Sequence, residues 1–182
     1  MNFVTTGPFD KYYVIPIPNS FQNCTWYLQH AAIRNACTDG NLEAVKYFHD
    51  TLKYPITSPS QLRKAIQSGS IELVKYLYDH KKTKNMFKYA KSIAINTFQL
   101  PMLQYFCEAP EFNTVNSGIN QTFKQNLFVA VKINNLPAVR YFIQSNTFSR
   151  DIVFAAYKLA KRHKLVPHVP IINYLNSIYC FD

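Results

Sequence analysis

A segment of eleven residues that returns along the chain is the feature that most limits how this sequence can fold. GNLEAVKYFHD, residues 40–50, recurs as GSIELVKYLYD, residues 69–79, with most positions identical or chemically similar. Weaker copies occupy residues 98–108, 134–144 and 167–177. One tyrosine marks each copy, and successive tyrosines are 29, 29, 36 and 33 residues apart (Tyr47, Tyr76, Tyr105, Tyr141 and Tyr174). Periods of this length predict an array of units that pack on their neighbours.

Each copy carries the signals of a helix start. Asn41, Ser70 and Asn135 hold the position where a side-chain oxygen can accept a hydrogen bond from the first helical turn. The residue two places later suits a first turn in every copy, as glutamate or proline (Glu43, Glu72, Pro101, Pro137 and Pro170). Apolar residues then recur every three or four positions, which predicts one buried stripe on each helix.

Another helix is predicted before each of the first four copies, over residues 28–37, 60–67, 87–96 and 123–132. Thr25–Trp26 and Ser58–Pro59 resemble the start signals of such helices. Each helix ends near an alanine, whose small side chain allows two helices to approach closely (Ala36, Ala65, Ala94 and Ala130). The repeating unit is therefore a pair of short antiparallel helices, and the predicted fold class is all-α.

The segments AIRNACTDGNLEAVKYF, residues 32–48, and LRKAIQSGSIELVKYL, residues 62–77, resemble the two-helix portion of ankyrin repeats. The likeness covers residues 25–177 and is sharp only in the first two copies. The Thr-Pro-Leu-His and Gly-Ala-Asp motifs of that family are absent, and later copies replace the elbow glycine by Phe98, Asn134 and Pro167. The resemblance implies a solenoid of about five antiparallel helix pairs with shortened or missing β-hairpins. Degenerate repeats of this kind resemble those of large DNA viruses and intracellular bacterial effectors.

The predicted organisation is an extended N-terminal capping segment, residues 1–24, followed by one ankyrin-like repeat domain, residues 25–182. Residues 109–122 are predicted to form a loop inserted between the third and fourth units, with a tight turn at residues 116–118. The approximate units of the repeat domain are residues 25–54, 55–83, 84–110, 119–148 and 149–182.

The cysteines indicate the compartment. They are scattered without paired spacing, which is typical of reduced, buried thiols in a cytosolic protein (Cys24, Cys37, Cys107 and Cys180). The sequence lacks the pattern of a signal peptide and any apolar run long enough to span a membrane. We therefore expect a cytoplasmic protein, in the host cytoplasm if it is viral or an effector.

The formal net charge of +10 comes largely from clustered cations. One basic cluster precedes and enters the third unit, and the other lies in the last unit (Lys81, Lys82, Lys84, Lys88 and Lys91; Lys158, Lys161, Arg162 and Lys164). Such clusters attract acidic proteins, nucleic acid or anionic membrane surfaces. Solvated helix faces and turns would carry the same residues without any binding role.

The sequence offers no constellation for catalysis, so we expect neither an enzyme nor a bound cofactor. The carboxylates are widely spaced, and four glycines are too few for a phosphate loop. His163, His168 and Cys180 could be imagined as zinc ligands, but they lack the close pairs that zinc sites use, so no metal is expected. Cys37 and Cys107 occupy core positions. The marker tyrosines could form a binding ladder, although packing between units is the favoured interpretation.

The leading functional hypothesis is a protein-interaction module that binds through the concave or loop surface of a helical stack. The expected partner is a protein with an acidic patch, and a host protein if the source is a virus or an intracellular bacterium. The predicted contact residues, beside the 109–122 loop, are Asn35, Lys64, Lys88, Lys91 and Lys132. The alternative is a basic surface that binds nucleic acid or an anionic membrane.

Overall fold

The computed structural model describes residues 9–12, 25–56, 58–80, 89–113, 119–162 and 167–181. Every regular element in these ranges is helical and they contain no β-strand, which confirms the predicted all-α class. The chain divides into two compact units, residues 1–88 and 89–182. None of the helices in the described ranges combines the length and the apolar character needed to cross a bilayer.

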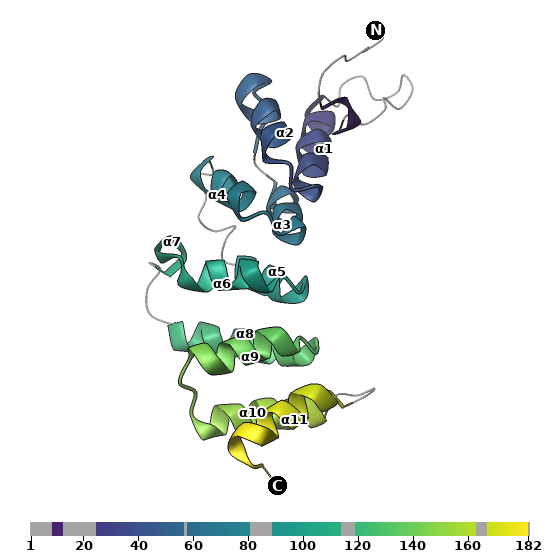
Figure 1. Cartoon of the computed structure of the whole chain (residues 1–182). Helices are drawn as coiled ribbons and strands as arrows, with labels where there is room; N and C mark the ends of the chain where they lie inside the picture. Colours follow the sequence, from purple (N-terminus) through teal and green to yellow (C-terminus); the bar gives the residue numbers. More distant parts are fainter. Residues whose placement is uncertain are drawn as a thin grey trace. The chain divides into compact units, whose positions relative to one another are not determined.

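The unit of residues 1–88 contains two helix pairs. Its elements are η1 (Asp10–Tyr12), α1 (Thr25–Thr38), α2 (Leu42–Lys46), the π-helical turn η2 (Tyr47–Thr51), α3 (Pro59–Ser68) and α4 (Ile71–His80). Helix α1 packs against α2 and α3, and α4 packs against α3 and α2 (Figure 1). The first helix of one pair therefore contacts the first helix of the next, and the second helices do the same.

The unit of residues 89–182 contains three pairs with the same pattern of contacts. Its helices are α5 (Ala90–Asn96), α6 (Leu100–Glu108), α7 (Pro110–Asn113), α8 (Ile119–Lys132), α9 (Leu136–Ser145), α10 (Arg150–Lys161) and α11 (Val169–Tyr179). Within pairs, α5 contacts α6, α8 contacts α9 and α10 contacts α11. Between pairs, α8 contacts both α5 and α10, and α9 contacts both α6 and α11 (Figure 1).

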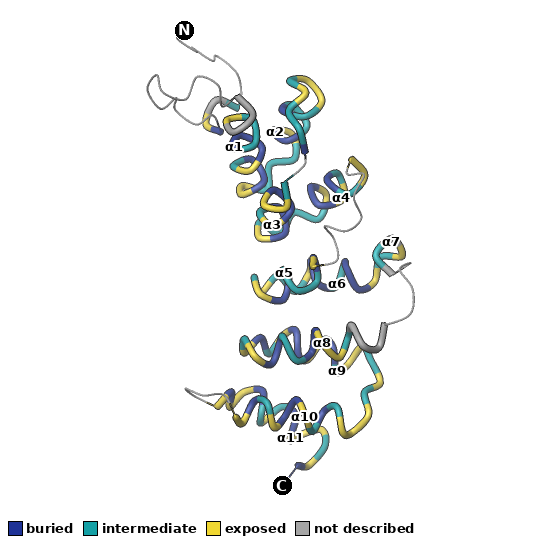
Figure 2. The backbone as a smooth tube through the Cα atoms, turned by 180° about the vertical axis from the view of Figure 1, so that it is seen from behind, coloured by how far each residue is buried: buried dark blue, intermediate teal, exposed yellow. Residues whose placement is uncertain are grey.

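The predicted apolar stripe supplies the core of the pairs. Phe48, Phe106 and Phe142 are fully buried, and complete burial of such a side chain contributes about 1.5–3 kcal/mol. The first residue of the stripe, for example Leu42, is only half-buried. The residue after the first-turn proline or glutamate, such as Met102, is buried as well. Figure 2 shows buried and exposed stretches alternating along the helices, as burial of one face requires.

The predicted helix starts are confirmed by their capping bonds. The side chain of Asn41 accepts a hydrogen bond from the Ala44 amide at 3.0 Å, and that of Ser70 accepts one from Leu73 at 3.3 Å. Asn135 caps α9 through the Ala138 amide at 3.1 Å. Helix α3 begins at the predicted serine with a complete capping box, in which Ser58 is the N-cap.

The elbow is the turn between the two helices of a pair, and a buried alanine precedes it. The carbonyl of Ala36 accepts the Asn41 amide at 3.0 Å, and that of Ala130 accepts the Asn135 amide at 2.9 Å. A bond over this interval is the Schellman bond that closes a helix end. It explains the alanine, because the chain that starts the second helix comes within hydrogen-bonding distance of that residue.

The first four elbows also share a left-handed residue. Gly40 has φ 67° and Gly69 has φ 78°, and the replacements in later copies adopt the same conformation, with φ 58° at Phe98 and 59° at Asn134. A Cβ at residue 40 would lie 3.1 Å from the Ser68 hydroxyl oxygen, so this side chain would have to shift by a few tenths of an ångström. The loss of glycine from the third and fourth copies therefore leaves the turn unchanged.

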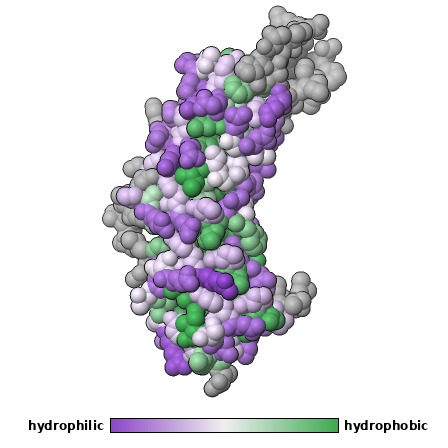
Figure 3. Space-filling model, in the orientation of Figure 1, coloured by the Kyte–Doolittle hydropathy of each residue, from purple (hydrophilic) through white to green (hydrophobic). Residues whose placement is uncertain are grey.

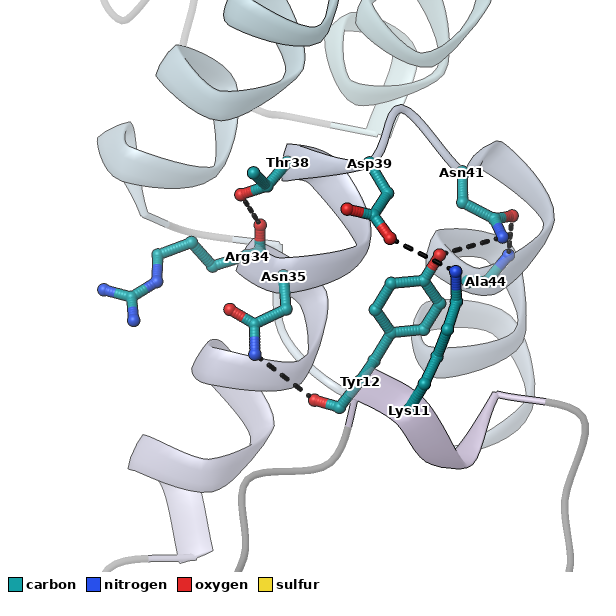
Figure 4. Close-up of polar contacts among 8 residues, drawn as sticks. All are labelled: Lys11, Tyr12, Arg34, Asn35, Thr38, Asp39, Asn41 and Ala44. Carbon is teal, nitrogen blue, oxygen red and sulfur yellow. Dashed lines mark hydrogen bonds and ion pairs between the residues drawn. The ribbon is translucent and has the colours of Figure 1, made fainter.

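The part of the N-terminal segment that the structure describes docks on the first pair (Figure 4). Residues 10–12 form a 3-10 turn rather than the extended backbone predicted for residues 1–24. Tyr12 is buried; its carbonyl accepts a bond from Asn35 and its hydroxyl accepts one from Asn41 at 3.1 Å. Lys11 adds an exposed ion pair with Asp39 at 3.2 Å. Residues 1–8 and 13–24 lie outside the described ranges.

The predicted loop at residues 109–122 is wrong in extent. Helix α7 occupies residues 110–113 and α8 begins at residue 119, so most of the predicted loop is helical. The expected tight turn at residues 116–118 falls outside the described residues. Pro110 opens α7 in a position where its missing N–H costs nothing, a signal that favoured a helix start over a loop.

Candidate functional site

Hydrogen bonds between pairs place the three elbows of residues 89–182 side by side. The Asn135 side-chain nitrogen donates to the Ile95 carbonyl at 2.8 Å, which joins the α8–α9 elbow to the end of α5. The His168 ring nitrogen Nε2 lies 3.3 Å from the Lys132 carbonyl, which joins the start of α11 to the end of α8. The described elbow residues are 95–99, 131–135, 161–162 and 167–169, and together they form the elbow edge.

The elbow edge carries cations and no acid. Lys132, Lys161 and Arg162 are exposed on it. Beyond residue 88 the sequence has nine lysines and arginines against four acids, Glu108, Glu111, Asp151 and Asp182. Glu108 ends α6 and Asp151 begins α10, at the helix ends away from the elbows. Both of these acids therefore lie away from the elbow edge, whose own cations attract anionic groups.

Two apolar side chains are exposed on the same edge. Phe98 retains 59% of its accessible surface and Val169 retains 52%. Figure 3 shows hydrophobic residues scattered among hydrophilic ones on the face that it draws, without one broad hydrophobic area. The elbow edge thus presents separate exposed apolar side chains among positive charges rather than one contiguous hydrophobic patch.

Aromatic rings hold the cations at the end of α10. The Lys158 ammonium lies 4.2 Å from the Phe154 ring centroid, and the Lys161 ammonium lies 4.7 Å from that of Tyr157. Contacts of this kind contribute about 0.5–1 kcal/mol at exposed sites. They order the lysine side chains without neutralising them, so both charges remain available to an anionic partner.

The predicted partner-binding residues are distributed over both units. Asn35 is half-buried in α1 and bonds the Tyr12 carbonyl, so it serves the N-terminal turn (Figure 4). Lys64 is half-buried in α3. Lys91 belongs to the start of α5, with its ammonium 5.3 Å from the Phe123 ring centroid. Of the five, only Lys132 lies on the elbow edge, and Lys88 lies outside the described residues.

The second predicted basic cluster is brought together with Lys132 on the elbow side of the 89–182 unit. Lys158, Lys161 and Arg162 follow one another along the last turns of α10. The sequence pattern did not indicate this, because Lys132 is separated from Lys158 by a whole helix and its flanking turns. The remaining members of the basic clusters lie outside the described residues (Lys81, Lys82, Lys84 and Lys164).

The marker tyrosines pack between pairs. The Tyr76 hydroxyl donates to the Asp50 carboxylate at 2.9 Å, and the Tyr141 hydroxyl donates to Glu108 at 3.4 Å. Each bond links a pair to the second helix of the preceding pair. Desolvation, reinforced by the neighbouring acid, raises the pKa of Tyr76. Desolvation likewise raises the pKa of Tyr141, whose neighbours include Cys107 as well as Glu108. These two hydroxyls are thus tied to carboxylates of the preceding pair.

The thiols do not assemble a reactive centre among the described residues. Cys37 and Cys107 are buried as expected, and burial raises the pKa of the Cys107 thiol. The prediction of a buried thiol is wrong for Cys180, which follows α11 and is exposed; Cys24 lies outside the described residues. Within those residues, no three side chains of the histidine, cysteine and acidic types group in a way that could hold a metal ion.

The elbow edge has three physical features. It combines fixed positive charge, exposed apolar side chains and turns closed by backbone hydrogen bonds. No known protein family, curated protein or solved structure significantly matches the chain.

Proposed function

We propose that this chain is a protein-interaction module whose helix pairs stack as an ankyrin-like solenoid and which binds a protein with an acidic patch. The proposal rests chiefly on the elbow edge of residues 89–182, where exposed cations from two helix pairs meet without an acid among them. A protein partner with complementary charge would be steered to this edge and held in register on it.

The contacts between pairs support the solenoid. Like helices contact like helices from one pair to the next in both units, as in repeat proteins whose units stack in one direction. Side chains that recur in the copies make contacts within a pair or between neighbouring pairs. Asn135 caps its helix and bonds the preceding pair, and Tyr141 bonds the preceding second helix. At the elbows of residues 89–182, exposed residues that differ from those of other copies, such as Phe98 and Lys132, can specify a partner.

Nucleic acid is the second candidate, because the same cations would attract a phosphate backbone. Binding of that kind weakens steeply as salt is raised and discriminates little between sequences. Single-strand binding proteins also stack successive bases on aromatic side chains. Among the described elbow residues Phe98 is the one exposed aromatic, which favours the protein partner.

An affinity capture from cell lysate tests the proposal. The purified full chain is used as bait in lysate with and without nuclease, at roughly 0.05 M and 0.5 M salt. We expect a protein recovered in constant ratio to the bait that survives nuclease and the higher salt. Recovery of nucleic acid alone, lost as salt rises, would replace the leading proposal by the second candidate.

A further inference from the structure

Among the elbows whose whole turn the structure describes, Phe98 occupies the one whose side chain is least suited to a left-handed residue. Its φ of 58° lies in the left-handed region, which costs a residue with a Cβ about 1–2 kcal/mol. Gly69 and Asn134 make the equivalent turn, and glycine and asparagine adopt this conformation more readily. The phenylalanine is also 59% exposed, so its burial recovers only part of that cost. The turn itself therefore does not explain an aromatic residue here.

The elbow that contains Phe98 is bonded to the elbow that contains Lys132. The Phe98 amide and the Asn135 side chain both donate to the Ile95 carbonyl, at 3.2 Å and 2.8 Å. Asn135 follows Lys132 by one helical turn, and the Lys132 carbonyl bonds the ring of His168. Val169, the neighbour of His168, is the second exposed apolar residue of the edge. The elbow edge thus runs from Phe98 past Lys132 to Val169, and side-chain bonds to backbone carbonyls join one elbow to the next.

We propose that the elbow edge docks an acidic protein segment in which apolar side chains alternate with carboxylates, with Phe98 as its apolar anchor. This inference rests on the proposed function and names the surface and partner chemistry. The carboxylates of the segment meet Lys132, Lys161 and Arg162, and its apolar side chains cover Phe98 and Val169. Charge complementarity identifies the occupant, since the described edge holds three exposed cations and no acid. A buried aromatic anchor within a ring of polar contacts is the usual centre of a protein interface.

The surface differs from the one that the sequence resemblance indicated. First helices and the residue 109–122 region were expected to make the contacts. The geometry points instead to the elbows, because there the strain, the exposed apolar area and the unbalanced charge coincide.

Fluorescence anisotropy with the full chain tests this surface. One probe is a labelled peptide of alternating glutamate and leucine with one tryptophan, and the other is a labelled single-stranded oligothymidine of equal net charge. The variants are Phe98→Asn, which keeps a residue suited to the turn, Lys132→Glu, and the pair Lys161→Glu with Arg162→Glu. Matched controls on the opposite edge are Tyr89→Ala, an exposed aromatic change, and the pair Lys124→Glu with Arg150→Glu. Circular dichroism shows that each variant is folded.

We expect each elbow variant to weaken peptide binding about tenfold, as loss of an interface anchor does, while the controls stay within about twofold of the wild type. Equal losses in elbow and control variants would overturn the assignment, since attraction would then come from net charge alone. Tighter binding of the oligothymidine than of the peptide would overturn the protein partner. If the lysate capture yields a protein partner that Phe98→Asn still binds fully, the elbow assignment fails while the proposed function stands. If the capture yields no protein, the proposed function itself fails.

Discussion

Replacement of Asn135 separates two contributions that one side chain makes to stability. Its oxygen caps α9 through the Ala138 amide, and its nitrogen donates to the Ile95 carbonyl of the preceding pair. The residue is only 3% exposed, so water cannot replace either bond. Loss of an N-cap costs about 1 kcal/mol, and loss of a neutral hydrogen bond costs about 1 kcal/mol. We therefore expect Asn135→Ala to lower the free energy of unfolding by about 2 kcal/mol.

Asn135→Ser should lose only the bond between pairs. Serine already caps the equivalent helix α4 in the unit of residues 1–88, where Ser70 accepts from the Leu73 amide. The serine variant keeps the cap and lacks a donor that reaches Ile95, so its expected loss is about 1 kcal/mol. Asn96→Ser, at an exposed position near the end of α5, is the matched control and should change little.

Urea unfolding of the full chain followed by far-ultraviolet circular dichroism measures these differences. The single tryptophan, Trp26, belongs to the unit of residues 1–88, so its fluorescence reports the other unit. The dichroism transition should move to lower urea in the order wild type, serine, alanine. An alanine variant within about 0.5 kcal/mol of the wild type would refute the reasoning, because surface substitutions alone produce changes of that size.

Further substitutions probe other polar side chains of the helices. Asn126→Ala should raise the free energy of unfolding by up to about 1 kcal/mol, since the buried side-chain nitrogen has no partner; reduced stability in urea would contradict this. Tyr76→Phe should lower the free energy of unfolding by about 1 kcal/mol, because the bond to Asp50 is lost. In the same titration, Tyr174→Phe should leave the free energy of unfolding unchanged or raise it, because the buried Tyr174 hydroxyl has no partner. The raised pKa values of Tyr76 and Tyr141 mean that the folded chain keeps protons which the unfolded chain releases above about pH 10. Stability should thus be complete below that pH and fall above it, less steeply in the double phenylalanine variant, as thermal unfolding across alkaline pH would show.

The parts of the fold that could be predicted depend on contacts between near neighbours in sequence. An N-cap such as Asn41 bonds an amide three residues away, and a helical stripe repeats every three or four residues, so both leave a mark in a short segment. This is why the starts of α2, α3, α4 and α9 follow from the sequence. The two-unit division, residues 1–88 and 89–182, has no such local signal.

The candidate site could be predicted only in part because long-range bonds assemble it. Lys132, Lys161 and Arg162 were recognised as cations, but the packing of α8 on α10 and the bond of the His168 ring to the Lys132 carbonyl bring their helix ends together. The bonds of Asn135 and His168 to the preceding pair connect residues 40 and 36 positions apart, and amide or imidazole side chains with such partners look like any other polar residue in the sequence. In the sequence, Phe98 looks like the loss of the elbow glycine. Its alignment with Gly40 and Gly69 nevertheless indicated that it adopts the same left-handed conformation.

The feature that defines an elbow is the alanine carbonyl rather than the glycine. Ala94 accepts the Gln99 amide at 3.0 Å across a turn that contains Phe98. Ala160 accepts the His168 amide at 3.2 Å, although three more residues separate them. In the second pair the Ser68 hydroxyl connects the alanine to the start of the second helix. It donates to the Ala65 carbonyl at 2.8 Å and accepts from the Ser70 amide at 3.4 Å. One acceptor thus tolerates turns of different length and composition, because it fixes only where the second helix starts. The residues between the alanine and the start of the second helix are therefore less constrained. The exposed phenylalanine and the exposed cations occur at these positions.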